Sequence, residues 1–322
     1  MKTIALEKPA GFSVSAASDF YAGFTPGAGM AAAATDQLTL AFRLDQSFVP
    51  VAVALRESGS VGERRLLLDV AGTDDLLAVQ KQIGRILGLE ADATAWFALG
   101  EQDLVVGDLQ REFPGFLTAA KASPYDAATW AVIATRMNQQ QAARIKQALA
   151  RELGDSIELG GRTLAVFPSP EALRALQRFP GLSAEKVVRL RAVAEAARAG
   201  LLDADRLREL GEQRALAELQ SVRGIGPWAA SHIYFRGAAP CDGLPTAEPR
   251  VLHGLASAYR LRSPTVATFQ RVAAGWRPFR MWVSVLLMRH LARVAGWHAP
   301  NLDQERAAAG RALLRRSALP AA

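Results

Sequence analysis

Two glycines in a short turn between two helix-forming stretches constrain this chain more than any other feature. The segment 219–228 reads Leu-Gln-Ser-Val-Arg-Gly-Ile-Gly-Pro-Trp. Gly224 and Gly226 allow a tight reversal of the backbone, because neither carries a Cβ. Pro227 suits the first position of a helix, where a backbone N–H has no intrahelical partner. We therefore predict a helix, a hairpin at the two glycines, and a second helix over residues 228–235.

The predicted second helix places free backbone N–H groups and the positive end of its dipole in front of the hairpin, which makes an anion site. A DNA phosphate fits such a site, with contacts from Arg223, Gly224, Ile225 and Gly226. The alternative is a plain connection between two helices, in which glycine is also common. A single carboxylate, Glu248, follows 22 residues after Gly226.

The charge of the chain is unevenly distributed. Residues 211–322 contain 15 Arg, no Lys and six acidic residues, a net charge of +9, whereas the whole chain carries +7. The first 210 residues therefore carry −2. This asymmetry predicts one face that binds a polyanion.

Composition excludes several classes of site. The one cysteine, Cys241, excludes a disulfide framework, a cysteine-rich zinc site and a four-cysteine iron–sulfur cluster. The four histidines are not spaced like metal ligands, so we expect no metal. No apolar run reaches the roughly 18 residues of a membrane span, and the start of the chain lacks the apolar core of a signal peptide. We expect a cytoplasmic protein that does not contact membranes.

The pattern along the chain predicts an α+β fold. Alternating or apolar stretches at 38–44, 51–55 and 64–70 predict strands of a small antiparallel sheet, followed by a helix ending at Leu87. From residue 113 onward the pattern is helical, apart from a short hairpin around Gly160-Gly161. Helices are expected over 126–136, 139–153, 184–198, 206–221, 251–259, 265–274 and 279–295.

At this point the chain resembles the helix–hairpin–helix DNA glycosylases, in particular the bacterial 3-methyladenine DNA glycosylase II branch. The resemblance covers residues 113–300 well and the sheet region weakly. The matching segments occur in the family's order. They are Phe113-Pro114-Gly115, 127–136, 167–173, Gly181-Leu182-Ser183 with Lys186, the hairpin, 242–248 and Trp276-Arg277-Pro278-Phe279-Arg280.

The resemblance implies hydrolysis of an N-glycosidic bond after the damaged nucleotide has been flipped out of the duplex. Glu248 occupies the place of the catalytic Asp, where a carboxylate stabilises the developing oxocarbenium ion. Asp242 matches an acidic position that we interpret as structural, bonding backbone in the loop. Bifunctional relatives place a Lys two residues after the second hairpin glycine. Trp228 stands there instead, so a monofunctional enzyme is expected.

The same resemblance supplies a base pocket and a plug. Trp228, His232 and Met288 stand at pocket positions, and Phe20 and Tyr21 are candidates for a further wall or for core packing. If Trp228 is considered without its position beside the hairpin, packing in the core is equally expected. The turn Arg136-Met137-Asn138-Gln139 matches the position that fills the space left by the flipped nucleotide. Met137 would intercalate, with Arg136 or Gln139 facing the orphaned base or the backbone. The alternative is a polar helix junction with Met137 in the core.

We therefore predict an N-terminal sheet domain with helices over residues 1–110, an all-α helix–hairpin–helix domain over 111–302 and a basic tail over 303–322. The predicted protein is a monomeric DNA glycosylase associated with the nucleoid. It needs no cofactor, and its partner is double-stranded DNA with a damaged, alkylated base. The rival hypothesis is a DNA-binding protein that senses lesions without excising them. A third is an N-terminal domain that recruits a partner.

Overall fold

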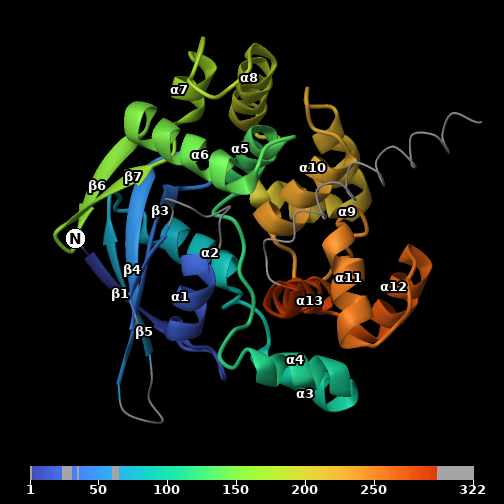
Figure 1. Ribbon diagram of the computed structural model, residues 1–322. Coiled ribbons are helices and arrows are strands. Elements are labelled where there is room, and N and C mark those ends of the chain that lie inside the picture. The colour runs from blue at the N-terminus through green and yellow to red at the C-terminus, as the bar shows by residue number, and fades with distance from the viewer. Residues whose placement is uncertain (1, 24–30, 35, 60–64, 296–322) are drawn as a thin grey trace, which may run out of the picture.

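A computed structural model describes residues 2–23, 31–34, 36–59 and 65–295 of the chain. It combines one five-stranded sheet, formed near the N-terminus, with a larger helical part beside it (Figure 1). This confirms the predicted fold class of a small antiparallel sheet followed by helices. The predicted tail over 303–322 lies outside the described residues, so the proposed division into domains stays a prediction.

The sheet is antiparallel throughout, in the order β1-β5-β4-β3-β2. The predicted strands at 38–44, 51–55 and 64–70 correspond to three neighbouring strands. The strands are β1 (Lys2–Glu7), β2 (Ala31–Ala34), β3 (Gln37–Arg43), β4 (Pro50–Ser58) and β5 (Arg65–Ala71).

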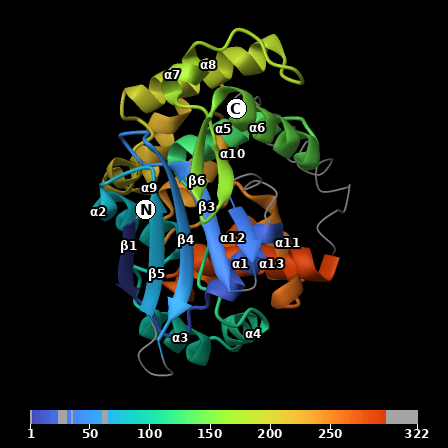
Figure 2. The ribbon, with the colours of Figure 1, turned by 90° about the vertical axis from the view of Figure 1, so that its left-hand side faces the viewer.

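The two faces of the sheet pack against different parts of the chain, because successive side chains of a strand point to opposite faces. Leu38, Leu40 and Phe42 belong to the main core, which extends from Phe12 to Leu287. The opposite face presents small residues, Ala41, Ala52 and Ala54. It is covered by Ile157, Leu159 and Val166 of the hairpin formed by β6 (Asp155–Leu159) and β7 (Arg162–Val166). Figure 2 shows this hairpin lying across β3 and β4.

The helices before residue 160 are α1 (Val14–Gly23), α2 (Leu76–Leu87), α3 (Ala93–Gln102), α4 (Leu104–Glu112), α5 (Pro124–Ala134) and α6 (Gln139–Leu153). Those after it are α7 (Pro170–Arg174), α8 (Ala184–Arg198), α9 (Ala204–Gln220), α10 (Pro227–His232), α11 (Pro249–Ala258), α12 (Val266–Ala273) and α13 (Arg280–Ala295). The short 3-10 helix η3 (Ala274–Trp276) joins α12 to the segment before α13.

Several helix ends follow from side-chain caps. Asp75 caps α2 and Ser183 caps α8, each accepting a hydrogen bond from a backbone N–H three residues on. Several boundaries differ from prediction by one or two residues, among them the starts of α5, α9 and α11. Helix α5 starts two residues early, because Ser123 caps it and Pro124 takes its first turn. The helix expected over 228–235 is a short α-helix that continues as the π-helix η2 (Ile233–Ala238).

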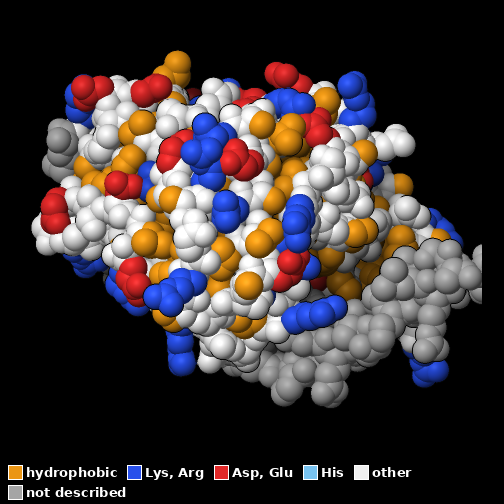
Figure 3. Space-filling view, turned by 90° about the horizontal axis from the view of Figure 1, so that it is seen from above, with side chains coloured by type: hydrophobic (Ala, Val, Ile, Leu, Met, Phe, Trp, Pro, Cys, Tyr) orange, Lys and Arg blue, Asp and Glu red, His pale blue; other side chains and the backbone are white. Residues whose placement is uncertain are grey.

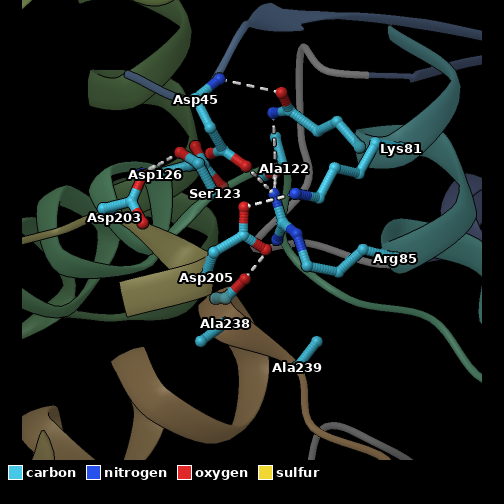
Figure 4. Close-up of polar contacts among 12 residues, drawn as sticks. Asp45, Lys81, Arg85, Ala122, Ser123, Asp126, Asp203, Asp205, Ala238 and Ala239 are labelled. Atoms are coloured by element: carbon cyan, nitrogen blue, oxygen red, sulfur yellow. Dashed lines mark hydrogen bonds and ion pairs between the residues drawn. The ribbon is translucent and has the colours of Figure 1, made fainter. Parts of the chain in front are cut away.

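The sheet region is fastened to the helical part by a buried guanidinium (Figure 4). Arg85, on α2, pairs with Asp45 and donates to the carbonyl oxygen of Gly237 at the end of η2. It also donates to the carbonyl oxygen of Ala122, just before α5, at 3.1 Å. The Arg85 side chain is 3% exposed. Nearby, Lys81 pairs with Asp205 of α9 at 2.6 Å, but in a largely exposed setting.

We predict that Arg85→Met lowers the free energy of unfolding by about 3–5 kcal/mol, because it leaves the partly buried Asp45 carboxyl without its guanidinium partner. The matched variant Lys81→Met removes an exposed pair and is expected to cost at most about 1 kcal/mol. Equilibrium unfolding in urea measures both. Equal losses in the two variants would show that Arg85 does not fasten the two parts together.

Candidate functional site

The turn between α9 and α10, called the hairpin in the sequence analysis, contains two glycines. Each is a glycine for a different reason. Gly224 has φ of +89°, and a Cβ there would lie 2.6 Å from side-chain carbons of Arg189. Gly226 has φ of −88°, and a Cβ there would meet no atom within 4 Å. The fold therefore requires glycine at 224. At position 226 neither the backbone conformation nor a neighbouring atom requires glycine. The absence of a side chain there leaves the backbone of the hairpin open to a ligand.

The start of α10 offers backbone rather than side-chain groups. Its N-cap is Gly226, with no side-chain capping bond, and its first residue is Pro227. Both are exposed. Ile225 is oriented inward, since its side chain is 4% exposed and its N–H donates to the carbonyl oxygen of Val222 at 3.0 Å. Ile225 thus anchors the hairpin, and the surface in front of α10 is formed by its neighbours.

Glu248 is buried beside the helix that follows the hairpin. It is 8% exposed and caps α11, accepting from the N–H of Arg250 at 3.2 Å. The Arg250 guanidinium holds both carboxylate oxygens, with Nε 2.8 Å from Oε1 and Nη2 2.9 Å from Oε2. Trp228 Nε1 donates to Oε2 at 3.2 Å. These contacts fix the position of the carboxylate.

The acidic residue at 242 lies apart from this carboxylate and holds the loop instead. Asp242 accepts from Arg280 Nε at 2.7 Å and from Arg280 Nη2 at 2.9 Å. Arg277 pairs with the same carboxylate at 3.3 Å. Burial alone would raise the pKa of Asp242, but its bonds with Arg280 hold it below the ordinary value. These contacts support a structural interpretation of Asp242, which ties the loop before Glu248 to the start of α13.

Trp228 and His232 form one stacked pair. Their ring centroids are 5.2 Å apart and the ring planes differ by 15°. His232 Nε2 is buried and has no hydrogen-bond partner among the described residues. Burial, with the positive charges of Lys121 and Arg236, holds the pKa of His232 well below its ordinary value. The imidazole is therefore neutral at physiological pH.

The other predicted pocket positions are less closely connected to Glu248. Met288 is partly buried on α13 and packs against the main core. Tyr21 is 3% exposed, and its hydroxyl donates to the carbonyl oxygen of Ala120 at 2.7 Å, which makes it a core residue. Phe20 is partly buried and stacks on Phe116 with centroids 5.1 Å apart.

The turn predicted to carry the plug joins α5 to α6. Asn138 caps α6, and Arg136 adopts a left-handed conformation with φ of +53°. Arg136 and Asn138 are exposed, whereas Met137 and Gln139 are partly buried. Met137 packs against the core, so intercalation would require its side chain to extend outward.

Three cations near Glu248 and His232 were not predicted. Arg250 was not singled out, although its place two residues after a capping carboxylate suggests the pairing. Lys121 is fully buried, and its backbone N–H donates to the carbonyl oxygen of Arg236 at 2.7 Å. The sequence could have indicated this buried lysine, because it is the one charged residue in the weakly polar segment 116–122. Arg236 carried no such signal.

The described surface does not carry all of the predicted basic charge. Four of the 15 arginines, at positions 306, 311, 315 and 316, lie outside the described residues. Over α7 and α8, seen from above, acidic and basic side chains are interspersed (Figure 3). Glu185 of α8, for example, pairs with Arg189 at 3.0 Å and with Arg223 of the hairpin at 3.3 Å.

In the described part of the chain, no group of three or more His, Cys, Asp or Glu side chains is arranged to hold a metal ion. Within the same residues, no helix has the length and apolar character needed to cross a bilayer.

Comparison with known proteins gives a consistent result. The chain is 25% identical over 222 residues to a DNA-3-methyladenine glycosylase of Bacillus subtilis, covering 66% of this chain and 72% of that protein. It is 31% identical over 231 residues to a probable bifunctional transcriptional activator/DNA repair enzyme AlkA of Mycobacterium tuberculosis, covering 68% of this chain and 44% of that protein. No family model matches the chain.

Among solved structures, a 3-methyladenine DNA glycosylase from Archaeoglobus fulgidus has the same fold. The TM-score is 0.72 at 19% identity, with 92% of this chain and all of that chain covered. An 8-oxoguanine glycosylase/lyase of Clostridium acetobutylicum, bound to DNA, gives a TM-score of 0.56 at 12% identity, over 82% of this chain and 97% of that one. These relatives and the shared fold support the helix–hairpin–helix DNA glycosylase superfamily and its AlkA-like branch.

We predict that stability falls as the pH is lowered from 7.5 to 5.5, in part because of His232. The unfolded chain takes up a proton near pH 6.5 that the folded His232 does not, so stability is retained above that pH and lost below it. His232→Phe should make the decline less steep by up to about 1.4 kcal/mol per pH unit. Urea unfolding at several pH values measures this, with the exposed His253→Phe as a control. The same slope in wild type and His232→Phe would contradict the prediction.

Proposed function

We propose that this protein is a monofunctional DNA glycosylase of base excision repair, which hydrolyses the N-glycosidic bond of damaged, alkylated bases. The observation that carries the proposal is the buried carboxylate of Glu248, held 3.2 Å from Trp228 at the start of α11. It lies on the same side of the fold as the helix that begins at the hairpin. The named relatives and the DNA-bound structural neighbours support a glycosylase acting on DNA.

In the proposed reaction the damaged nucleotide leaves the stack and its sugar faces Glu248. As the bond from C1′ to the base breaks, the carboxylate stabilises the positive charge that develops on the sugar. Water then adds to C1′, and its proton is passed on to the departing base or to solvent. Arg250 keeps the carboxylate in one orientation, while Trp228 provides an aromatic surface for the base.

The proposed enzyme leaves an abasic site and does not cleave the strand. Strand cleavage in the bifunctional branch uses a lysine that forms a Schiff base, and Trp228 stands at that position. There is no lysine after residue 210 in the sequence. Lys186 already donates to the carbonyl oxygen of Ile133 at 2.7 Å, in a bond that joins α8 to α5.

The proposed DNA interface consists of the hairpin and the turn between α5 and α6. Gly224, Gly226 and Arg223 would contact a phosphate. Met137 would enter the duplex, with Arg136 and Gln139 beside it. We propose that the protein acts as a monomer on double-stranded DNA in the cytoplasm, at the nucleoid. The regions 1–110 and 111–302 would act as one unit, because the buried core is continuous across them.

Substituting Glu248 tests the proposed reaction. Glu248→Gln keeps the size of the side chain and removes its charge, so single-turnover excision should fall by about 10²–10³-fold with DNA affinity preserved. Glu248→Asp keeps the charge but shortens the side chain by one bond, and should fall by up to about 10²-fold. A Gln variant as active as wild type would exclude Glu248 from the reaction. Activity gained only in the Asp variant would favour the non-excising sensor.

Replacing each hairpin glycine by alanine distinguishes an effect on DNA binding from an effect on folding. Gly226→Ala should weaken duplex binding by about tenfold, equivalent to about 1.4 kcal/mol. Its free energy of unfolding should change by no more than about 0.5 kcal/mol. Gly224→Ala is the control, and should destabilise the fold by about 1–3 kcal/mol because of its positive φ. Fluorescence anisotropy with a labelled duplex and urea unfolding measure the two effects. If Gly226→Ala binds the duplex as tightly as wild type does, the hairpin is not part of the DNA interface.

A further inference from the structure

Three polar side chains from separate helices meet where α4, α11 and α13 come together. Ser257 lies on α11, His290 on α13 and Glu112 at the end of α4. The hydroxyl oxygen of Ser257 is 3.0 Å from His290 Nε2, and His290 Nδ1 is 2.8 Å from Glu112 Oε2. Helix α13 packs against both of the other helices (Figure 1), so its histidine lies between the serine and the carboxylate.

This group of side chains lies at the far end of α11 from Glu248. Glu248 caps the start of the helix, whereas Ser257 is in its last turn. Ser257 follows Glu248 by nine residues in the sequence. At a rise of about 1.5 Å per residue, the two lie about 13 Å apart along the helix axis. The reaction proposed at Glu248 therefore does not involve Ser257 or His290.

The three side chains differ in their exposure to solvent. Glu112 is 10% exposed and His290 is 16% exposed, whereas Ser257 is open to solvent. Burial strengthens the hydrogen bond between the acid and the imidazole, because water competes for it less. A nucleophile, in contrast, has to be reached by its substrate. The exposure of the group therefore increases in the order expected of an orienting acid, a base and a nucleophile.

The carboxylate of Glu112 is held by two side chains of α13. Besides its contact with His290, its Oε1 lies 2.7 Å from Arg293 Nε. His290 and Arg293 are three residues apart, so they share one face of the helix. A carboxylate can only accept hydrogen bonds, so its contact with Nδ1 places the imidazole proton on that atom. Nε2 then carries the lone pair that accepts the proton of the Ser257 hydroxyl.

In this arrangement His290 can serve as a general base toward Ser257. As the Ser257 oxygen forms a bond to an acyl carbon, its hydroxyl proton moves to His290 Nε2. The bond from that carbon to the leaving oxygen then breaks, and His290 returns the proton to the leaving group. Water, deprotonated by the same histidine, next attacks the acyl-serine and releases a carboxylic acid. The net reaction is the hydrolysis of an ester to an acid and an alcohol.

The position of Ser257 in the last turn of α11 restricts the class of substrate. A helix C-terminus exposes carbonyl oxygens and the negative end of the dipole. An oxyanion formed at Ser257 is therefore not stabilised by backbone N–H groups of this helix. One such donor contributes about 10²–10³-fold to the rate of a hydrolase that has it. The acyl donor must therefore be activated, as an aryl ester is, because its phenolate leaves readily.

We propose that Ser257, His290 and Glu112 form a second site, at which Ser257 is a nucleophile for activated esters. Ser257 and His290 take part in the bond changes. Glu112 is a positioning residue that acts through His290. The inference goes beyond the proposed glycosylase function and does not depend on it, because the two sites share no residue.

The test measures the reactivity of Ser257 in the full chain. An alkyl fluorophosphonate, which phosphonylates nucleophilic serines irreversibly, is the labelling probe, and labelled peptides are identified by mass spectrometry. Ser257 should be labelled at least about 10²-fold faster than Ser263, an exposed serine before α12. The hydrolysis of p-nitrophenyl acetate should be lost in Ser257→Ala. Labelling of Ser257 no faster than that of Ser263, or hydrolysis that Ser257→Ala leaves unchanged, would overturn the inference.

Further variants distinguish a nucleophilic site from a purely structural contact. His290→Gln should slow the labelling of Ser257 by at least about 10²-fold. Glu112→Gln should slow it by at least about tenfold, because an amide can accommodate the wrong tautomer of the imidazole. The control is His253→Gln, an exposed histidine one turn earlier on α11, which should be labelled at the wild-type rate.

A structural role alone predicts lower melting temperatures in His290→Gln and Glu112→Gln with no change in the labelling of Ser257. That outcome would contradict the inference. If His290→Gln does not fold, as judged by thermal melting, the comparison of Ser257 with Ser263 in wild type decides.

Discussion

The guanidinium of Arg85 lies where three parts of the chain meet. It comes from the helix that follows the sheet, pairs with Asp45 at the end of a strand, and holds carbonyl oxygens at the start of α5 and the end of η2. A buried charge with several hydrogen-bond partners has few alternative positions, because each move leaves a polar group unpaired. The segment before α5 and the end of η2, which continues from the helix that carries Trp228, are thereby fixed to the same point.

The carboxylate of Glu248 shows how a change of one methylene can be accommodated. The related enzymes are expected to use Asp at this position, where a short side chain suits the start of a helix. In this chain the longer side chain still caps α11, and it also contacts Arg250 and Trp228. The additional length is therefore matched by additional donors. Arg250 therefore partly compensates the negative charge of Glu248 before any substrate binds. The carboxylate then stabilises the positive sugar less, and stabilisation of the departing base contributes more.

The parts of the fold that sequence patterns predicted are those with strong local signals. Helices α6 and α8 have the predicted bounds, because Asn138 and Ser183 are effective caps. Strand β1 and the short strand β2 were missed. A partly exposed strand such as β1 pairs with β5, residues 65–71, and this long-range pairing leaves little local trace. The π-helix was missed because its residues are compatible with an ordinary helix, and only tertiary packing distinguishes the two.

For the site, the sequence indicated Glu248, Trp228 and the hairpin through motif and resemblance. It did not indicate the cations around them. Lys121 and Arg236 are more than 100 residues apart in sequence and meet through a backbone hydrogen bond. Their burial reverses the usual preference of charged side chains for the surface. Only the folded arrangement shows that these side chains are buried side by side, since net charge along the sequence does not specify which charges are buried together.

The hairpin β6–β7 has a consequence for synthesis of the protein. It covers the alanine face of the sheet with Ile157, Leu159 and Val166, yet the last strand of the sheet ends at Ala71. At translation rates of about 5–20 residues per second, that face remains uncovered for about 5–20 seconds on the ribosome. An uncovered face made of alanine is only weakly adhesive, because small side chains bury little apolar area. The small residues on this face thus protect the nascent chain during the interval before its cover has been made.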